Sequence, residues 1–149
     1  MTAQASRNQE EARIRALLDD WTAGVRVRDV DRVMSHYATD IVIFDLAPPL
    51  EYAGADTLRK SLQAWFSTWQ GPLDYEIRDL NITAGDEVAF GRSLNRLRGT
   101  KTDGEQADVW FRQTLCLKKI ESKWRIAHQH ESVPFYMDGS YRAAVDLEP

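Results

Sequence analysis

Two histidines separated by one residue, His128 and His130, are the side chains of this sequence best suited to acid–base chemistry. They lie in an expected strand over residues 123–132, where alternation places them on the same face as Trp124 and Ile126. Imidazole exchanges protons near neutral pH, so either ring could be an acid or a base in an interior pocket. Alternatively, both are hydrogen-bonded residues that line a mostly apolar pocket, which we favour.

A metal site is the third interpretation of the same pair, since His-x-His with a carboxylate can bind zinc or iron. The spacing of the sequence indicates no third ligand. The sequence also contains no glycine-rich phosphate loop and no nucleophile elbow. We therefore expect neither a metal nor any other cofactor.

Asp45 is the second candidate, because it directly follows the apolar run of residues 41–44. It is expected at the rim of the fold or inside it. In apolar surroundings the pKa of its carboxyl group would rise, which suits a base that works near neutral pH. An equally good explanation is a turn or capping aspartate before Pro48 and Pro49.

Arg92 and Arg112 are cationic residues within otherwise apolar strand segments. A buried arginine needs a carboxylate or an anionic ligand beside it. The two could bind an acidic ligand, and ion pairs with Asp45 or Asp108 explain them equally well.

Aromatic residues are expected to build most of the core and the walls of a pocket. The sequence contains five tryptophans, whose indoles bury a large area and present flat surfaces. We take Trp21, Trp65 and Trp110 as ligand-binding candidates. Tyr52, which follows the prolines, is expected to close the mouth of the pocket.

Helical spacing and β-branched runs predict helices followed by a strand meander. The expected helices cover residues 14–25, 30–37 and 57–69, and the expected strands cover residues 41–44, 73–83, 87–97, 105–119 and 123–132. Asp29 is expected to cap the second helix, and Gly71–Pro72 is expected to end the third. This order predicts an α+β layer fold in which three helices pack on the concave face of a curved antiparallel sheet. One domain is expected over residues 1–149, with a core at about 10–135 and a C-terminal arm from 135 onward.

Composition limits the partners of the protein. The net charge is −4 and cationic residues are interleaved with acidic ones, so we expect no nucleic-acid partner. The sequence has no apolar stretch of membrane-spanning length, so we expect no membrane partner. The single cysteine, Cys116, is expected to be a buried and inert thiol in a reducing, cytoplasmic compartment.

The segment over residues 105–119 is apolar on both faces. Val109 and Phe111 alternate with Trp110 and Cys116, so both faces of the sheet need a cover. Helices would cover one face, and a second copy of the chain would cover the other. We predict a homodimer through the sheet.

The segment 123–134 resembles the last strand of SnoaL-like proteins and of the association domain of calcium/calmodulin-dependent protein kinase II, with Lys-Trp, His-x-His, Ser and Pro in that order. Residues 28–31, 37–40 and 44–45 are similar to segments of bacterial ketosteroid isomerase. The resemblance implies the cone-shaped, cystatin-like α+β barrel of the nuclear transport factor 2-like superfamily.

The same resemblance implies roles for individual residues. Asp45 matches the general base of the isomerase, and Trp21 falls near its oxyanion-hole tyrosine. The second oxyanion donor of the isomerase is an aspartic acid, which has no counterpart near Arg112 or Gln113. Arg92 and Arg112 match pocket arginines of the kinase domain.

Two functions of different class follow. The first is a cofactor-independent isomerase, cyclase or dehydratase for a small hydrophobic carbonyl compound, with Asp45 or His130 moving a proton. The second is a non-catalytic domain that binds a small ligand or forms a dimer. His128 is a ligand-binding candidate in both.

Overall fold

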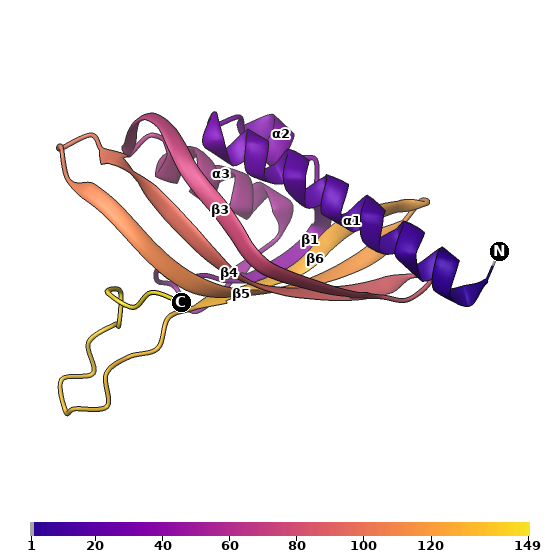
Figure 1. The fold of residues 1–149 in the computed structure, drawn as a ribbon. Coiled ribbons are helices and arrows are strands. Elements are labelled where there is room, and N and C mark those ends of the chain that lie inside the picture. The colour runs from indigo at the N-terminus through magenta and orange to yellow at the C-terminus, as the bar shows by residue number, and fades with distance from the viewer. Residues whose placement is uncertain (1) are drawn as a thin grey trace.

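The computed structural model describes residues 2–149, and Figure 1 shows a long curved sheet with its helices on one side. This arrangement confirms the predicted α+β class. The elements along the chain are α1 (Ala3–Arg26), α2 (Val30–Met34), β1 (Tyr37–Phe44), β2 (Tyr52–Ala53), α3 (Ala55–Phe66), β3 (Trp69–Ala84), β4 (Val88–Lys101), β5 (Gln106–Ile120) and β6 (Lys123–Ser132).

Each helix begins at a residue suited to its N-terminus. The Thr2 hydroxyl accepts the Ala5 N–H at 3.0 Å at the start of α1. Asp29 caps α2 as predicted, because its carboxylate accepts the Arg32 N–H at 3.1 Å. Gly54 precedes α3 with a φ of +90°, a conformation that favours glycine.

The six strands form one open sheet in the order β2-β1-β6-β5-β4-β3. All neighbouring pairs are antiparallel except β1 and β6, which run parallel. β1 therefore lies next to β6, the last strand of the meander β3–β6, and the two strands end side by side. This parallel pair brings the loop after β1 next to the end of β6.

The third helix and the following strand divide the chain differently from our prediction. The helix ends at Phe66, and Trp69 already belongs to β3, where it pairs with Lys101. The Gly71–Pro72 step, expected to stop the helix, lies inside β3 where the register shifts between Gln70 and Asp74. Proline has no N–H for the ladder, so an irregularity in the strand accommodates it.

The core lies between the helices and the concave face of the sheet. Ile14, Val25, Ile41, Leu117 and Ile126 are each at most 1% exposed. Burial of such a side chain contributes about 1.5–3 kcal/mol, so these residues fix the helices against the sheet.

One extra residue in β6, Ala127, interrupts the pairing with β5. Leu117 pairs with Ile126, but the preceding residue Cys116 pairs with His128. A β-bulge of this kind reverses the faces to which the following side chains point.

The bulge overturns our assignment of faces in β6. Trp124 and Ile126 are buried in the core, and beyond the bulge Gln129 is buried while His130 is exposed. The prediction that His128 and His130 share the face of Trp124 is therefore wrong. Both histidines lie on the outer face of the sheet.

The outer face of the sheet carries exposed apolar side chains. Val88 and Phe90 are 62% and 52% exposed on β4, and Phe44 is exposed at the end of β1. Cys116 is also exposed, so the prediction of a buried thiol is wrong. The alternation along β5 places this side chain outward, although its strand neighbours Leu115 and Leu117 point into the core.

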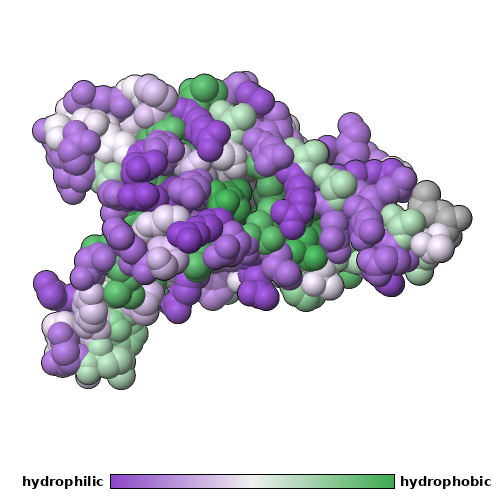
Figure 2. Space-filling view, in the orientation of Figure 1, coloured by the Kyte–Doolittle hydropathy of each residue, from purple (hydrophilic) through white to green (hydrophobic). Residues whose placement is uncertain are grey.

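Residues 133–149 form an arm that loops away from the sheet (Figure 1). A bridge between Phe135 and Ala143 closes it, and the Tyr136 hydroxyl donates to Asp146. Figure 2 shows a mostly hydrophilic surface, with apolar groups gathered between the helices and the sheet and on the arm. None of the helices in residues 2–149 is long and apolar enough to cross a membrane.

Candidate functional site

Two carboxylic acids meet where the parallel strands β1 and β6 end side by side. Asp45 follows β1 directly, and Glu131 lies one residue beyond His130, which pairs with Phe44. A pocket of about 660 Å³ is lined by Asp45, Glu131, His130, Phe44 and residues 46–51. The pocket therefore contains two titratable carboxyl groups and one imidazole.

Glu131 has the most unusual acidity of the residues that line this pocket. Burial is the largest cause, and together with the nearby Asp45 carboxylate it raises the pKa of Glu131 to about 8. The Gln113 and Gln129 amides act in the opposite direction by donating to its carboxylate. Near pH 7, Glu131 is thus a neutral acid beside a second carboxyl group.

Both amide donors reach the same oxygen of Glu131. Gln113 Nε2 on β5 donates to Glu131 Oε1 at 3.0 Å, and Gln129 Nε2 on β6 donates to it at 2.7 Å. Gln113 and Gln129 are each at most 6% exposed. The structure thus holds the carboxyl group of Glu131 from two strands.

A buried tyrosine and tryptophan extend this network toward α1. The Tyr37 hydroxyl donates to Gln129 Oε1 at 2.8 Å, and Trp21 Nε1 donates to the Tyr37 oxygen at 3.0 Å. Burial raises the pKa of the Tyr37 hydroxyl strongly, so it stays protonated. The indole N–H of Trp21 is therefore committed to a protein partner.

A second buried chain lies along β4 and β3. Ser93 Oγ donates to Asn95 Oδ1 at 2.7 Å, and Asn95 Nδ2 donates to the Tyr75 hydroxyl at 2.7 Å. Burial also raises the pKa of Tyr75, and the Gln113 amide lies beside its hydroxyl. The interior is thus lined by linked polar groups as well as by apolar ones.

Asp45 lines the pocket, whereas Tyr52 lies just beyond the loop that lines it. Asp45 is exposed at the rim, and its Oδ1 accepts the Leu46 N–H at 2.7 Å. The Tyr52 hydroxyl donates to the Pro48 carbonyl at 3.3 Å, which ties β2 to the loop over the pocket. Their roles in catalysis and ligand binding remain predictions.

The two histidines make edge-to-face contacts with Phe44 outside the core. The His128 ring lies 4.7 Å from Phe44, and the His130 ring lies 5.2 Å from it. His128 Nδ1 is 2.7 Å from the Val42 carbonyl, so this nitrogen carries the proton and donates. Of the two, only His130 lines the pocket with the carboxyl groups.

Arg92 and Arg112 are exposed on the outer face, which corrects the expectation that they reach the interior. Arg112 Nε donates to Ser132 Oγ at 3.1 Å. Neither arginine pairs with Asp108, whose carboxylate binds Arg96 at 2.8 Å. The sequence alone could not assign the two arginines to the outer face. Apolar residues occur at both the inward-facing and the outward-facing positions of β4 and β5, so alternation does not tell the faces apart.

Two of the predicted pocket tryptophans lie elsewhere. Trp110 packs on the outer face against the guanidinium groups of Arg78 and Arg96, 5.7 and 5.4 Å from its ring. Trp65 packs on Trp69, with ring centroids 5.8 Å apart. Both positions lie outside the residues that line the pocket of the carboxyl pair.

Sequence reasoning missed Glu131, together with its partners Gln113 and Gln129. Gln129 and Glu131 are two residues apart in β6, so their side chains point to the same face. A prediction with the register of the strand shifted by one residue would have placed both inside. The only signal was a pair of polar residues alternating with the histidines. Nothing in the sequence locates the bulge at Ala127.

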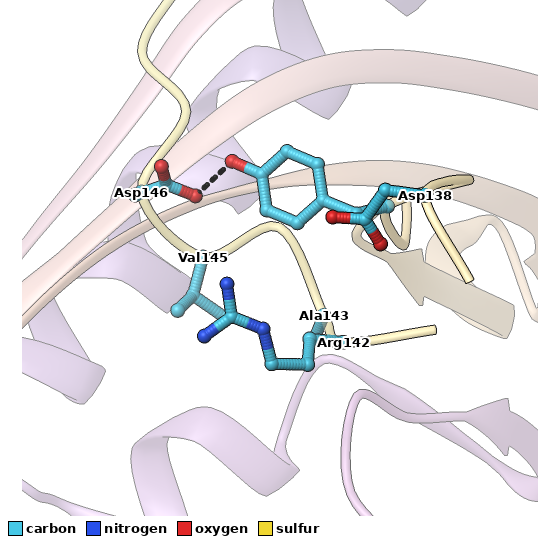
Figure 3. Close-up of a pocket in the computed structure, with 6 residues that line it drawn as sticks. Asp138, Arg142, Ala143, Val145 and Asp146 are labelled. Carbon is cyan, nitrogen blue, oxygen red and sulfur yellow. Dashed lines mark hydrogen bonds between the residues drawn. The ribbon is translucent and has the colours of Figure 1, made fainter. Parts of the chain in front are cut away.

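A second pocket, of about 490 Å³, lies within the C-terminal arm (Figure 3). Its lining includes Asp138, Arg142 and Asp146, and Tyr136 donates to Asp146 across it. It shares no residue with the pocket of Asp45 and Glu131. Residues 2–149 also contain no group of three or more His, Cys, Asp or Glu side chains placed to bind a metal ion.

Solved structures of similar proteins superpose on most of this chain. An NTF2-like protein of unknown function from Pseudomonas putida is 28% identical, with a TM-score of 0.85 over 100% of both chains. A ketosteroid isomerase-like protein from Erwinia carotovora atroseptica is 24% identical, with a TM-score of 0.72 over 84% of this chain and 96% of that one. An uncharacterized protein with a cystatin-like fold from Caulobacter vibrioides is 18% identical, with a TM-score of 0.70 over 82% of this chain and 87% of that one.

No curated protein sequence matches the chain. The two structural relatives below 25% identity support the fold alone, and they agree with the open curved sheet and its helices. The model of the SnoaL-like domain matches residues 14–136, which includes every element from the middle of α1 to the end of β6 and both carboxyl groups of the site. The chain belongs to the SnoaL-like domain family.

Proposed function

We propose that this domain catalyses cofactor-independent proton transfer on a small hydrophobic carbonyl compound, as an isomerase, cyclase or dehydratase. The observation that carries the proposal is the pair of Asp45 and Glu131, in which burial and the neighbouring carboxylate raise the pKa of Glu131 to about 8. A protonated carboxylic acid and a nearby carboxylate can act as acid and base at the same pH.

In the proposed reaction the Asp45 carboxylate removes a proton from the carbon next to the substrate carbonyl. The electrons of that C–H bond move onto the carbonyl oxygen, and the protonated Glu131 donates a hydrogen bond to the resulting oxyanion. Asp45 then returns its proton to another atom of the substrate. No oxidant, reductant or metal is needed for this sequence.

The pocket lining supports a small apolar substrate. Besides the carboxyl groups and His130, it contains Phe44, the apolar loop residues Leu46 and Leu50, and two prolines. Apolar walls with a few polar groups are typical of small-molecule sites. We assign His130 to substrate binding at the rim, because its side chain is exposed.

A ketosteroid isomerase-like protein shares the fold of this chain, which is compatible with this class of reaction. The position that we compared with the second oxyanion donor is occupied by Gln113, whose amide holds Glu131. Glu131 would thus supply, from β6, the acidic donor that the resemblance placed on the neighbouring strand.

Hydrogen–deuterium exchange next to a carbonyl tests the proposal without knowledge of the natural substrate. A panel of small cyclic and aromatic ketones would be incubated with the protein in D₂O, and loss of the adjacent C–H signal followed by proton NMR. We expect protein-dependent exchange for at least one ketone and a decrease of about 10²–10⁴-fold in Asp45→Asn. Asp40→Asn, an exposed aspartate in β1, is the matched control.

The second candidate function is non-catalytic ligand binding. The open position of Asp45 at the rim favours it, because an exposed site does not exclude water from the reacting groups. In that case ketones or small acids would bind in a titration, Asp45→Asn and His130→Ala would change the affinity, and the exchange rate would equal that of protein-free solution for the whole panel. This last result would overturn the catalytic proposal.

The activity should depend on pH through Glu131. We expect the exchange rate to fall above pH about 8, because the acid that stabilises the oxyanion then loses its proton. Glu131→Gln keeps an N–H donor but does not titrate, so this alkaline decrease should disappear. Glu121→Gln, an exposed residue in the turn before β6, should keep the wild-type profile.

A second copy of the chain remains our proposed partner, in contact through the outer face of the sheet. The exposed Val88 and Phe90 support it, since large apolar side chains gathered on a sheet face often mark an interface. A cytoplasmic location also remains a proposal.

A further inference from the structure

We infer that Trp21, Tyr37 and Gln129 form a hydrogen-bond chain of fixed direction that places the acid proton of Glu131 on Oε2. This inference rests on the proposed function only in assigning a use to that proton. The chain itself consists of contacts between described side chains, and it can be tested without a substrate.

The direction of the chain follows from its first member. An indole N–H can donate but never accept, so the Tyr37 oxygen must accept the proton of Trp21 Nε1 over 3.0 Å. The Tyr37 hydrogen is then directed to its other neighbour, Gln129 Oε1, at 2.8 Å. Trp21 is 7% exposed and Tyr37 is 8% exposed, so water has little access to either group.

The hydrogen bond from Tyr37 also fixes the orientation of the Gln129 amide. Since its oxygen accepts from Tyr37, its NH₂ group must face Glu131, where Nε2 lies 2.7 Å from Oε1. Gln113 Nε2 lies 3.0 Å from the same oxygen. Two N–H donors thus point at Oε1, and this oxygen can only accept.

A proton on the neutral Glu131 must therefore lie on Oε2. Within residues 2–149 no side chain or backbone group donates a hydrogen bond to that oxygen, so it is the one able to donate toward Asp45 or a bound carbonyl. The chain thus makes Tyr37 and Trp21 positioning residues, which act through Gln129 and touch no substrate.

Other titratable groups face Glu131 and must be considered in any titration. Asp45 comes from the loop after β1, His130 lines the same pocket, and Tyr37 and Tyr75 face Glu131 from β1 and β3. The pKa values of both tyrosines are raised by burial, so neither tyrosine changes charge near neutral pH. Asp45 and His130 are left unchanged in the variants below.

The experiment measures the titration of Glu131 in protein labelled with ¹³C at the glutamate carboxyl groups, with the signal assigned by its absence in Glu131→Gln. In Tyr37→Phe the Gln129 amide is free to rotate and turn its oxygen to Glu131, which removes one N–H donor from the carboxylate. We expect the midpoint of Glu131 to rise by about one pH unit. Trp21→Phe should also raise the midpoint of Glu131, but by less. Without the indole N–H, the Tyr37 hydroxyl can either donate to the Gln129 amide or accept from it.

The matched control is Trp124→Phe. Trp124 is 5% exposed, and its N–H also donates to a side chain, Glu10, at 2.5 Å, but it has no link to Glu131. A midpoint in Tyr37→Phe within about 0.2 pH units of wild type, or an equal shift in Trp124→Phe, would overturn the inference. If Tyr37→Phe does not fold, the infrared C=O band of neutral Glu131 in the wild type tests the inference instead. A low-frequency band means that the carbonyl oxygen accepts two hydrogen bonds, as expected for Oε1. A band at the frequency of a carbonyl without donors would overturn the inference.

The outcome is independent of the proposed function. A shifted midpoint with no ketone exchange in the wild type would support the chain and contradict the catalytic proposal. Ketone exchange with an unshifted midpoint would support catalysis and contradict the chain.

Discussion

At the scale of single residues, Glu131 is the side chain on which the most interactions converge. It is enclosed by two amides, faces a second carboxyl group and lines the pocket. Its elevated pKa has a consequence for stability as well as for chemistry. The folded protein binds a proton at this site over a pH range in which the unfolded chain has released it.

The pKa of Glu131 is about 8 in the folded protein, against an ordinary value of 4.5. Between these values the native state holds one proton more than the unfolded state, so the free energy of unfolding must fall as pH rises, by up to about 1.4 kcal/mol per pH unit. Urea unfolding at pH 5, 7 and 9 should show this slope. Glu131→Gln should reduce it, and Glu121→Gln should leave it unchanged.

At the scale of elements, β6 shows how one inserted residue decides which side chains reach the site. The strand is built of ordinary alternating residues on both sides of Ala127, and the bulge alone exchanges their faces. The contacts of α1 with α2 and with the turn before β1 are of a different kind, since they include a partly exposed ion pair. Asp20 on α1 binds Arg32 at 2.7 Å and His36 at 2.6 Å.

We expect Asp20→Asn to lower the urea midpoint modestly at pH 7. The hydrogen bonds from Arg32, then from His36, lower the pKa of Asp20 below its ordinary value of 3.8. A lowered pKa contributes stability that is present above pH about 4 and is lost as pH falls through the folded pKa. The difference between Asp20→Asn and wild type should thus shrink toward pH 3, whereas Asp19→Asn, its exposed neighbour, should match wild type at every pH.

Two glycines on β4 provide a test of how closely the residues of the neighbouring strand β3 pack against it. A Cβ added at Gly99 would lie 2.9 Å from the Trp69 ring, whereas one added at Gly91 would find its nearest atom at 3.6 Å. Gly99→Ala should therefore destabilise the fold by about 1–3 kcal/mol through overpacking. Gly91→Ala should cost clearly less in the same thermal or urea unfolding measurement, and equal costs would contradict this packing.

At the scale of the whole molecule, the sheet has one face covered by helices and one face open to solvent. The open face carries exposed Val88, Phe90 and Phe44, and the arm adds exposed Phe135 and Met137. An apolar face of this kind is suited to a second copy, because a two-fold contact pairs the same patch with itself.

Phe90→Glu is expected to dissociate the proposed homodimer into monomers. A charge at the centre of an apolar contact is desolvated without a partner, which costs several kcal/mol. Analytical ultracentrifugation at micromolar concentration measures the outcome. Val27→Glu, at a position that is 63% exposed against 52% for Phe90 but lies directly after α1, should remain dimeric. A wild-type monomer under these conditions would contradict the proposal.

The sequence by itself determined the class of the fold and most of its elements. Helical spacing, the Asp29 cap and the β-branched runs act over a few residues, so local chemistry suffices to predict them. Local order also placed Asp45 at the end of an apolar strand before two prolines, which left the rim and the interior open as its position. The resemblance of residues 123–134 pointed to the family that the domain model then established.

Only the tertiary structure decided which side chains form the site. The extra residue at Ala127 has no local signature, and it moved His128 and His130 outward and Gln129 and Glu131 inward. The parallel pairing of β1 with β6 brought Asp45 to Glu131 across more than eighty residues of sequence. Register and strand order depend on the packing of the whole sheet, and the raised pKa of Glu131 exists only because that packing buries it beside another acid.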